Sequence, residues 1–470
     1  MAWSSGNERG FMMLAPAPGL PGDERVDGID LGPGIESARR RLAALSSVCL
    51  QGRVTNVIGL TIEATGPGAA VGSQCEIVGS VDGEPPVLAE VVGFRQKRVL
   101  LMPLGEVRGI APGRRVRLVR ERPLVYVGRG LLSRVLDALG APLDGRPIPG
   151  GETAYPLYGT QLNPLDRRPI DQPLDLGIRS LNALLTCGRG QRLGIFAGSG
   201  VGKSALLGMI ARYTRADVNV IALVGERGRE VRAFIERDLG DGLAHSVVIV
   251  ATSDQPPLVR LRGAYLASSI AEYFRDQGRH VLLMMDSLTR FAMAQREVGL
   301  SIGEPPSTRG YTPSVFAALP RLLERAGPAA NGSITGLYTV LVEGDDLNEP
   351  IADAARSLLD GHVVLSRQLA AQGQYPAIDL LPSVSRVMID VVPEEETRRA
   401  NRVRAWLATH RDAEDLINIG AYAQGKNPRI DEAVAKAPSI ADFFRQRLDE
   451  PCSLEESRGL LAALVGEAVP

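Results

Sequence analysis

The sequence predicts an α/β protein in which a parallel sheet flanked by helices follows a small β-barrel and precedes a helical domain. Short β-branched runs separated by turn glycines fill residues 47–121. Apolar strand-like runs then alternate with helical patterns over residues 122–392, and amphipathic helical patterns without strand signals follow over residues 393–470. A chain of 470 residues is long enough for about three such domains.

Residues 1–46 are expected to form a flexible arm. Residues 1–34 carry four prolines among many glycines, a composition that opposes helix formation and supplies no core. Residues 34–45, "GIESARRRLAAL", then show a short helical pattern with three arginines on its solvent side.

The composition excludes several classes of protein. Lys and Arg total 53 against 54 Asp and Glu, so no global positive charge attracts nucleic acid or an anionic membrane. The four cysteines show no paired spacing and only four histidines occur, which argues against a disulfide framework and a zinc cluster. A signal peptide and an apolar run of about 18 residues are both missing. We therefore expect a cytoplasmic protein that reaches a membrane only through partners.

The barrel region carries six strand-like runs: "VCLQGRV", "GLTIEA", "QCEIVGSV", "PVLAEVVGF", "RVLLMPL" and "RRVRLV". Such barrels bind single-stranded nucleic acid by stacking bases on aromatic side chains. Phe94 is the only aromatic residue between Ser46 and Arg120. A structural barrel is therefore expected, without a specific nucleic-acid partner.

The central region follows a segment rich in proline and glycine, "LGAPLDGRPIPGG". Its predicted strands are apolar throughout, as in a parallel sheet buried on both faces; they cover residues 193–196, 218–224, 247–251, 281–285 and 336–342. In the C-terminal region, "PEEETRRANRVRAWLATH" and "PSIADFFRQRLDE" predict amphipathic helices.

The stretch "GIFAGSGVGKSALLGMIARYTRAD" predicts a strand, a glycine-rich turn and a helix. In such a P-loop the backbone N–H groups point at phosphate oxygens, a Lys reaches the β and γ phosphates and a hydroxyl binds magnesium. Ala197 stands where the first glycine is usual. The sequence thus predicts a P-loop NTPase core, and the residues expected to hold the nucleotide are Gly198, Ser199, Gly200, Val201, Gly202, Lys203, Ser204 and Ala205.

Two acidic residues follow predicted strands. Asp286 ends the apolar run of "RHVLLMMDSLTR", at the sheet edge where ligands bind, and is expected to hold Mg²⁺ directly or through water. Glu226 in "VIALVGERGRE" follows the strand after the P-loop helix, where a carboxylate can orient water and accept its proton. A surface ion pair of Glu226 with Arg227 or Arg229 is the alternative.

Several long motifs in a fixed order carry a resemblance: "GERGRE", "MDSLTRFAMAQRE", "GEPPSTRGYTPSVFAALPRLLERAG", "VLVEGDDLNEPIADAARSLLDGHVVLSR" and "YPAIDLLPSVSRV". Over residues 48–438 the chain resembles the hexameric ATPases related to the catalytic headpiece of rotary ATP synthases. "AGSGVGKS" followed by "ARYTRADV" is most similar to the flagellar protein-export (type III secretion) ATPases. Injectisome ATPases resemble the chain nearly as well.

The resemblance assigns roles to individual residues. It makes Lys203 the phosphate-binding lysine, Ser204 and Asp286 the magnesium ligands, Glu226 the activator of water, and Arg386 an arginine finger inserted into the neighbouring subunit's site. Arg262 and Arg227 match site arginines, Tyr375 matches an aromatic residue that stacks on adenine, and Tyr422 is expected to close the other side of that pocket.

The same resemblance implies a homohexamer that hydrolyses ATP with Mg²⁺ and helps to unload export substrates from their chaperones. Expected partners are a stator-like regulatory protein, a central stalk-like protein and the membrane export gate, which would associate the enzyme peripherally with the inner membrane. The proline-rich arm departs from the amphipathic helix with which family members often begin. An injectisome ATPase, a non-hydrolysing subunit of the ATP synthase type and an RNA-translocating ring are the alternatives.

Overall fold

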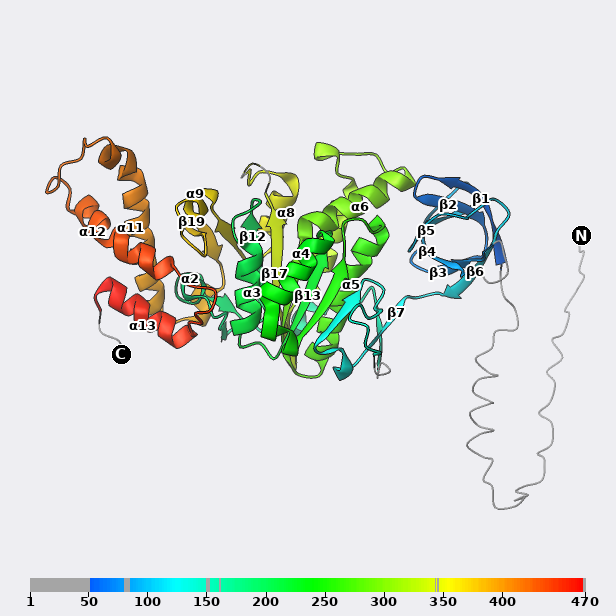
Figure 1. Cartoon of the computed structure of the whole chain (residues 1–470), viewed down its shortest axis with the longest axis horizontal. Coiled ribbons are helices and arrows are strands. Elements are labelled where there is room, and N and C mark those ends of the chain that lie inside the picture. Colours follow the sequence, from blue (N-terminus) through cyan, green and yellow to red (C-terminus); the bar gives the residue numbers. More distant parts are fainter. Residues whose placement is uncertain are drawn as a thin grey trace, which may run out of the picture. The chain divides into compact units, whose positions relative to one another are not determined.

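The computed structural model describes residues 51–79, 85–148, 153–159, 162–342, 344 and 346–467 (Figure 1). These residues belong to one compact unit, Leu50–Pro470. The predicted arm, with its helix at residues 34–45, lies outside the described residues. Among the described helices, none combines the length and the apolar composition that crossing a membrane requires.

As predicted, the N-terminal strands close into an antiparallel barrel. Their order in it is β1-β2-β5-β4-β3-β6. Their inward side chains, which include Ile62, Cys75 and Leu101, form a separate apolar core. Closure leaves no unpaired strand edge. The strands are β1 (Gln51–Ile58), β2 (Thr61–Thr65), β3 (Gln74–Ile77), β4 (Val87–Arg95), β5 (Arg98–Pro103) and β6 (Arg115–Arg120).

Among the described residues, the central sheet has nine strands, eight of them in the order β19-β18-β12-β17-β15-β13-β14-β8. Its strands are β8 (Arg134–Asp137), β12 (Arg192–Ala197), β13 (Val218–Val224), β14 (Ser246–Ala251), β15 (His280–Asp286), β16 (Gly327–Ala329), β17 (Gly332–Leu341), β18 (Gly361–Leu365) and β19 (Ile378–Ser385). The five predicted strands are all present. The sheet is mixed, however, because β16 and β19 pair antiparallel to their neighbours.

Alternate side chains of the central strands enter two different cores, as the two-residue period of a strand requires. On β13, Val220 and Ala222 belong to one core and Ile221 and Leu223 to the other. The first face is covered by α5 (Pro257–Asp276), α6 (Leu288–Ile302), α7 (Pro313–Leu323) and α8 (Pro350–Leu358). The second is covered by α2 (Arg179–Leu184), α3 (Lys203–Tyr213) and α4 (Gly228–Ala233). The sheet is thus buried on both faces.

Three helices form the C-terminal region: α11 (Glu394–Asn418), α12 (Pro428–Phe444) and α13 (Leu454–Val465). The helix expected over residues 438–450 is wrong in its bounds, because Pro438 lies inside α12 and the helix ends at Phe444. Beyond that end, the Gln446 N–H donates to the carbonyl oxygen of Tyr375 at 2.9 Å. This bond belongs to residues 445–450, a non-helical segment with a turn at residues 448–449 that returns to the central domain.

The remaining helices and strands are short: β7 (Leu124–Val127) pairs with β9 (Thr153–Pro156), β10 (Pro173–Leu174) pairs with β11 (Cys187–Gly188), and α9 (Arg367–Ala371) and α10 (Met388–Val391) flank β19.

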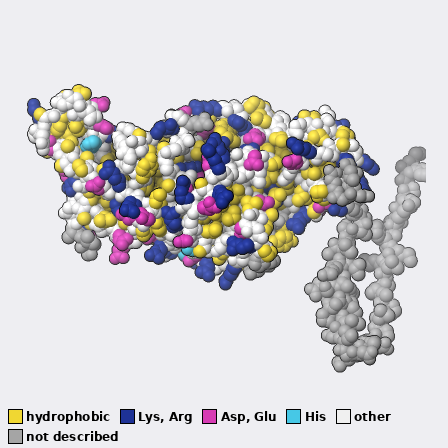
Figure 2. Space-filling model, viewed as in Figure 1, with side chains coloured by type: hydrophobic (Ala, Val, Ile, Leu, Met, Phe, Trp, Pro, Cys, Tyr) yellow, Lys and Arg dark blue, Asp and Glu magenta, His cyan; other side chains and the backbone are white. Residues whose placement is uncertain are grey.

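On the face shown in Figure 2, basic and acidic side chains are intermixed. This face therefore offers no continuous positive surface.

Candidate active site

The glycine-rich turn joins β12 to α3, as the sequence predicts. Gly200 and Gly202 have φ values of 79° and 87°, a conformation that residues with a Cβ rarely adopt. A Cβ on Gly202 would also lie 3.3 Å from the ring of Tyr375. Ala197 points its methyl group into the core beneath the turn, so it does not obstruct the phosphate side. Val201 is also buried there and offers the turn only its backbone.

The structure brings Lys203, Glu226 and Asp286 together at the carboxyl edge of the sheet. Asp286 ends β15, and Glu226 lies two residues beyond the end of β13, the strand paired with β15. The Lys203 Nζ donates to Asp286 Oδ1 and lies 3.6 Å from Glu226 Oε1. The three side chains are 13%, 16% and 6% exposed. One cation is thus held between two mostly buried carboxylates.

This crowding shifts the pKa values of the cluster. Burial raises the pKa of Glu226 to about 7; the nearby Asp286 adds to the shift and Lys203 opposes it. For Lys203, burial alone would lower the pKa, but Asp286 and Glu226 outweigh it and hold the pKa above its usual value. A carboxyl that titrates near neutral pH is suited to accept a proton from water.

The donor set at this edge fits a magnesium ion. Mg²⁺ is usually held by one or two carboxylates together with substrate phosphates and water. Asp286 and the hydroxyl of Ser204, the second residue of α3, are the candidate ligands. Within the part of the chain that the structure describes, no three His, Cys, Asp or Glu side chains form a metal-binding group.

Arg290 is a candidate site residue that the sequence analysis missed. A Cβ placed on Gly225, the residue before Glu226, would lie 2.8 Å from the Arg290 Cβ, so this side chain runs alongside the Glu226 loop. Its Nε is buried and has no hydrogen-bond partner among the described residues. A buried guanidinium N–H without a partner is suited to an anion. Its position four residues after Asp286, in the first turn of α6, was the sequence feature that could have identified it as a site residue.

The structure contradicts the assignment of Arg262 to the nucleotide site. This residue lies on α5 and is buried, and its guanidinium donates to Glu90 Oε2 on barrel strand β4 at 2.5 Å. The hydroxyl of Tyr158 donates to the other Glu90 oxygen at 2.5 Å. Arg262 thus joins the barrel to the central domain.

We expect Arg262→Ala to lower the free energy of unfolding by about 3–5 kcal/mol, because it leaves the buried Glu90 carboxylate without its counter-charge. Urea unfolding of the purified protein measures this. Arg262→Met combined with Glu90→Gln removes both charges and should lose less stability. Wild-type stability of Arg262→Ala would contradict this structural role.

The other two predicted arginines, Arg227 and Arg386, are exposed. The side chain of Arg227 is 67% exposed and approaches Glu230 at 3.7 Å. Arg386 is exposed and follows β19, whose last residue, Ser385, pairs with Gly361 at the amino end of β18. The P-loop follows the opposite, carboxyl end of β12, and five residues of β18 span about 16 Å. Arg386 therefore does not face the P-loop of its own chain.

A pocket of about 490 Å³ lies beside the start of α3. Tyr375 lines it and is 46% exposed, with its ring against Gly202. Leu206, Met209 and Leu448 supply apolar walls. Size and lining suit the base of a nucleotide whose phosphates bind at the P-loop.

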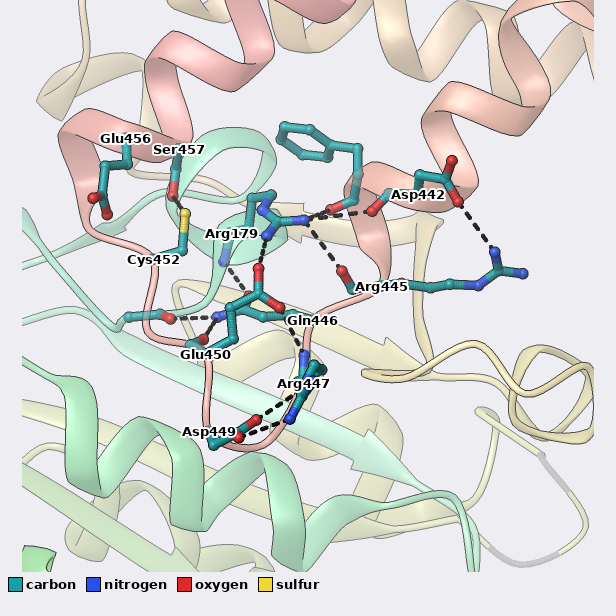
Figure 3. Close-up of polar contacts among 12 residues, drawn as sticks. Arg179, Asp442, Arg445, Gln446, Arg447, Asp449, Glu450, Cys452, Glu456 and Ser457 are labelled. Carbon is teal, nitrogen blue, oxygen red and sulfur yellow. Dashed lines mark hydrogen bonds and ion pairs between the residues drawn. The ribbon is translucent and has the colours of Figure 1, made fainter.

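Residues 445–450 form the far wall of this pocket, and Arg179 holds them in place (Figure 3). The Arg179 guanidinium contacts the Glu450 carboxylate and donates to the Arg445 carbonyl oxygen at 3.1 Å. The Gln446 side chain donates to the Gly177 carbonyl oxygen at 2.8 Å. The helical pattern of residues 438–450 gave no sign of this wall, because it predicts that the helix continues through these residues.

The structure also contradicts the expected place of Tyr422. Its hydroxyl donates to Asp431 Oδ1 at 2.8 Å, near the start of α12. The pocket lies at the opposite end of α12, which has 17 residues and so spans about 25 Å. Residues 445–450 therefore occupy the side of the pocket that Tyr422 was expected to close.

Models of known protein families match the barrel, the central domain and the C-terminal helices in turn. Residues 177–385 match the nucleotide-binding domain of the ATP synthase alpha/beta family, and residues 54–119 match the beta-barrel domain of that family. Residues 392–463 match the T3SS EscN ATPase C-terminal domain. The predicted fold class is confirmed.

Individual relatives are similar over most of their length. The flagellum-specific ATP synthase of Bacillus subtilis is 55% identical over 88% of this chain and 95% of its own. The type 3 secretion system ATPase of Xanthomonas euvesicatoria is 50% identical over 91% of this chain and 97% of its own. The structure of the assembled ATPase EscN from the enteropathogenic E. coli type III secretion system matches with a TM-score of 0.84 at 45% identity, over 88% of this chain and all of the other. The chain belongs to the ATP synthase alpha/beta family, in the group of flagellum-specific ATP synthases and type 3 secretion system ATPases.

Proposed function

We propose that this chain is the ATPase of a flagellar protein-export apparatus and hydrolyses ATP in a ring of six identical subunits. The proposal rests on the placement of Lys203 between Glu226 and Asp286 at the end of a P-loop. This arrangement supplies a cation for phosphates, a carboxylate for a metal and a second carboxylate whose pKa suits a general base.

Each residue has a distinct part in the proposed reaction. The backbone N–H groups of the turn and the Lys203 Nζ bind the phosphates, and Tyr375 contacts the base. Ser204 and Asp286 hold Mg²⁺, which neutralises the phosphate charge when it is bound. Glu226 orients the attacking water and accepts its proton. The Arg290 Nε has no hydrogen-bond partner in the part of the chain that the structure describes; it lies beside the Glu226 loop and is suited to a phosphate oxygen.

The site is completed by a neighbouring subunit in this proposal. Arg386 is exposed at the amino end of β18, where its Nη2 donates to the Arg356 carbonyl oxygen at 3.2 Å; in the proposed ring it exchanges this contact for one in another copy's site. A guanidinium there stabilises charge that develops on the transferred phosphoryl group. Such a head-to-tail contact closes into a ring when the rotation permits. Arg227 is exposed beside Glu226, where it can approach the same phosphates.

We infer the cellular role of the ring from the proteins that the chain is similar to. Release of export substrates from chaperones at a membrane gate fits a flagellum-specific enzyme, and we place the protein in the cytoplasm, associated peripherally with the inner membrane. A central stalk-like protein and a stator-like regulator are the proposed partners, since a structure of EscN is described in complex with its central stalk EscO. The similarity to EscN favours an injectisome role as the second candidate.

The test is the ATPase rate per chain of the purified protein over a wide range of protein concentration. If sites are completed between subunits, the rate per chain rises with concentration until rings are assembled and then stays constant. A constant rate at all concentrations, above that of the Lys203→Ala blank, would contradict the shared site. A rate equal to the blank would contradict hydrolysis by this chain.

A further inference from the structure

A buried hydroxyl lies beside the predicted magnesium ligand. Thr339 is on β17, the strand between the P-loop strand β12 and the Asp286 strand β15. It is fully buried, and its Oγ1 donates to Asp286 Oδ1 at 2.7 Å. The other acceptor in reach, the Met285 carbonyl oxygen, is 3.4 Å away. A hydroxyl has one proton to donate, and the shorter contact assigns it to Asp286.

The two oxygens of Asp286 therefore have different surroundings. Oδ1 accepts from both Lys203 Nζ and Thr339 Oγ1. No described residue donates a hydrogen bond to Oδ2. A carboxylate held at one oxygen presents the other to a ligand.

We propose that Thr339 is a positioning residue that fixes the orientation of the Asp286 carboxylate, the candidate magnesium ligand. This inference rests on the proposed function, because it assigns Asp286 to the metal. Lys203 has to serve the phosphates once a nucleotide is bound, and the Thr339 hydroxyl is then the donor that remains on Oδ1. The χ2 torsion of Asp has a broad energy minimum, so the carboxylate orientation depends on such a bond. At other metal sites, residues that hydrogen-bond to a metal ligand also fix the orientation of that ligand.

The test compares Thr339→Val with the wild type in binding of a fluorescent ADP analogue, titrated with Mg²⁺ and repeated without it. Val keeps the branched shape and removes the hydroxyl. We expect the apparent affinity for Mg²⁺ to fall about 10- to 100-fold, while binding without Mg²⁺ is unchanged. Thr339→Ser, which keeps the hydroxyl, should remain near the wild type. Thr339→Ala removes the same hydroxyl with a smaller side chain and should repeat the loss.

Thr335 provides the matched control. It lies on the same strand, is also buried, and its Oγ1 accepts from the Gly190 N–H at 2.8 Å, away from Asp286. Thr335→Val should change stability without changing the Mg²⁺ dependence.

Two results would overturn the inference. One is a wild-type Mg²⁺ dependence in both Thr339→Val and Thr339→Ala. The other is an equal loss of binding with and without Mg²⁺, shared by Thr335→Val, which would mean a general packing role. If the wild type itself binds the analogue without any dependence on Mg²⁺, this inference fails, whereas the proposed function is decided separately by the ATPase rate per chain.

Discussion

Glu226→Gln is expected to reduce ATP hydrolysis by about 10²- to 10⁴-fold, because an amide cannot accept the proton of the attacking water. The substitution keeps the size of the side chain. It also removes a negative charge 3.6 Å from Lys203, so phosphate binding should be kept or strengthened. The measurement is phosphate release at saturating ATP, together with binding of a fluorescent ATP analogue.

A matched control separates the role of this carboxylate from a general loss of charge. Glu236 has an exposed side chain that pairs with Arg232 one helical turn away. Glu236→Gln should therefore hydrolyse ATP at the wild-type rate. Glu226→Gln with an unchanged rate would show that another group activates the water.

Arg386→Ala is expected to fold, to bind ATP and to hydrolyse it about 10³- to 10⁵-fold more slowly, because it removes a guanidinium that acts on the transition state. The loss should appear in kcat rather than in nucleotide affinity. Steady-state kinetics of assembled rings, with assembly checked by light scattering, measure both quantities.

Arg386→Lys extends this test. Lysine keeps the charge but lacks the planar fork that contacts two oxygens at once, so most of the loss should remain. If Arg386→Ala hydrolyses ATP at the wild-type rate in intact rings, the role assigned to this residue is wrong.

The sequence predicted the parts of the fold that local pattern determines. The apolar run of residues 218–224 indicated a strand buried on both faces, and β13 places its alternate side chains in two cores. The barrel followed in the same way from alternating runs between turn glycines. The antiparallel strand β19 was not predicted, because pairing direction depends on contacts between segments far apart in the chain.

In the candidate site, too, local pattern predicted some residues, and contacts between distant segments determined the others. Lys203, Glu226 and Asp286 each end or follow a predicted strand, and a parallel sheet brings such positions to one edge. Arg262 was misplaced because its partner, Glu90, is 172 residues earlier in the chain and belongs to the barrel. Residues 445–450 were missed because the helical pattern continues past Phe444, whereas hydrogen bonds to Gly177 and Tyr375 end the helix there.

If each site is shared between two subunits, mixed rings of two inactive variants should regain activity. Glu226→Gln and Arg386→Ala chains are each assembled alone and then together from denatured or dissociated subunits, and ATP hydrolysis is measured. In the mixture, some interfaces join the intact Glu226 of one chain to the intact Arg386 of the other. We expect the mixture to hydrolyse ATP well above either parent. A mixture of Lys203→Ala and Glu226→Gln, whose substitutions lie in the same half of the site, should not. A mixture of Glu226→Gln and Arg386→Ala that stays at the level of its parents would contradict the shared site.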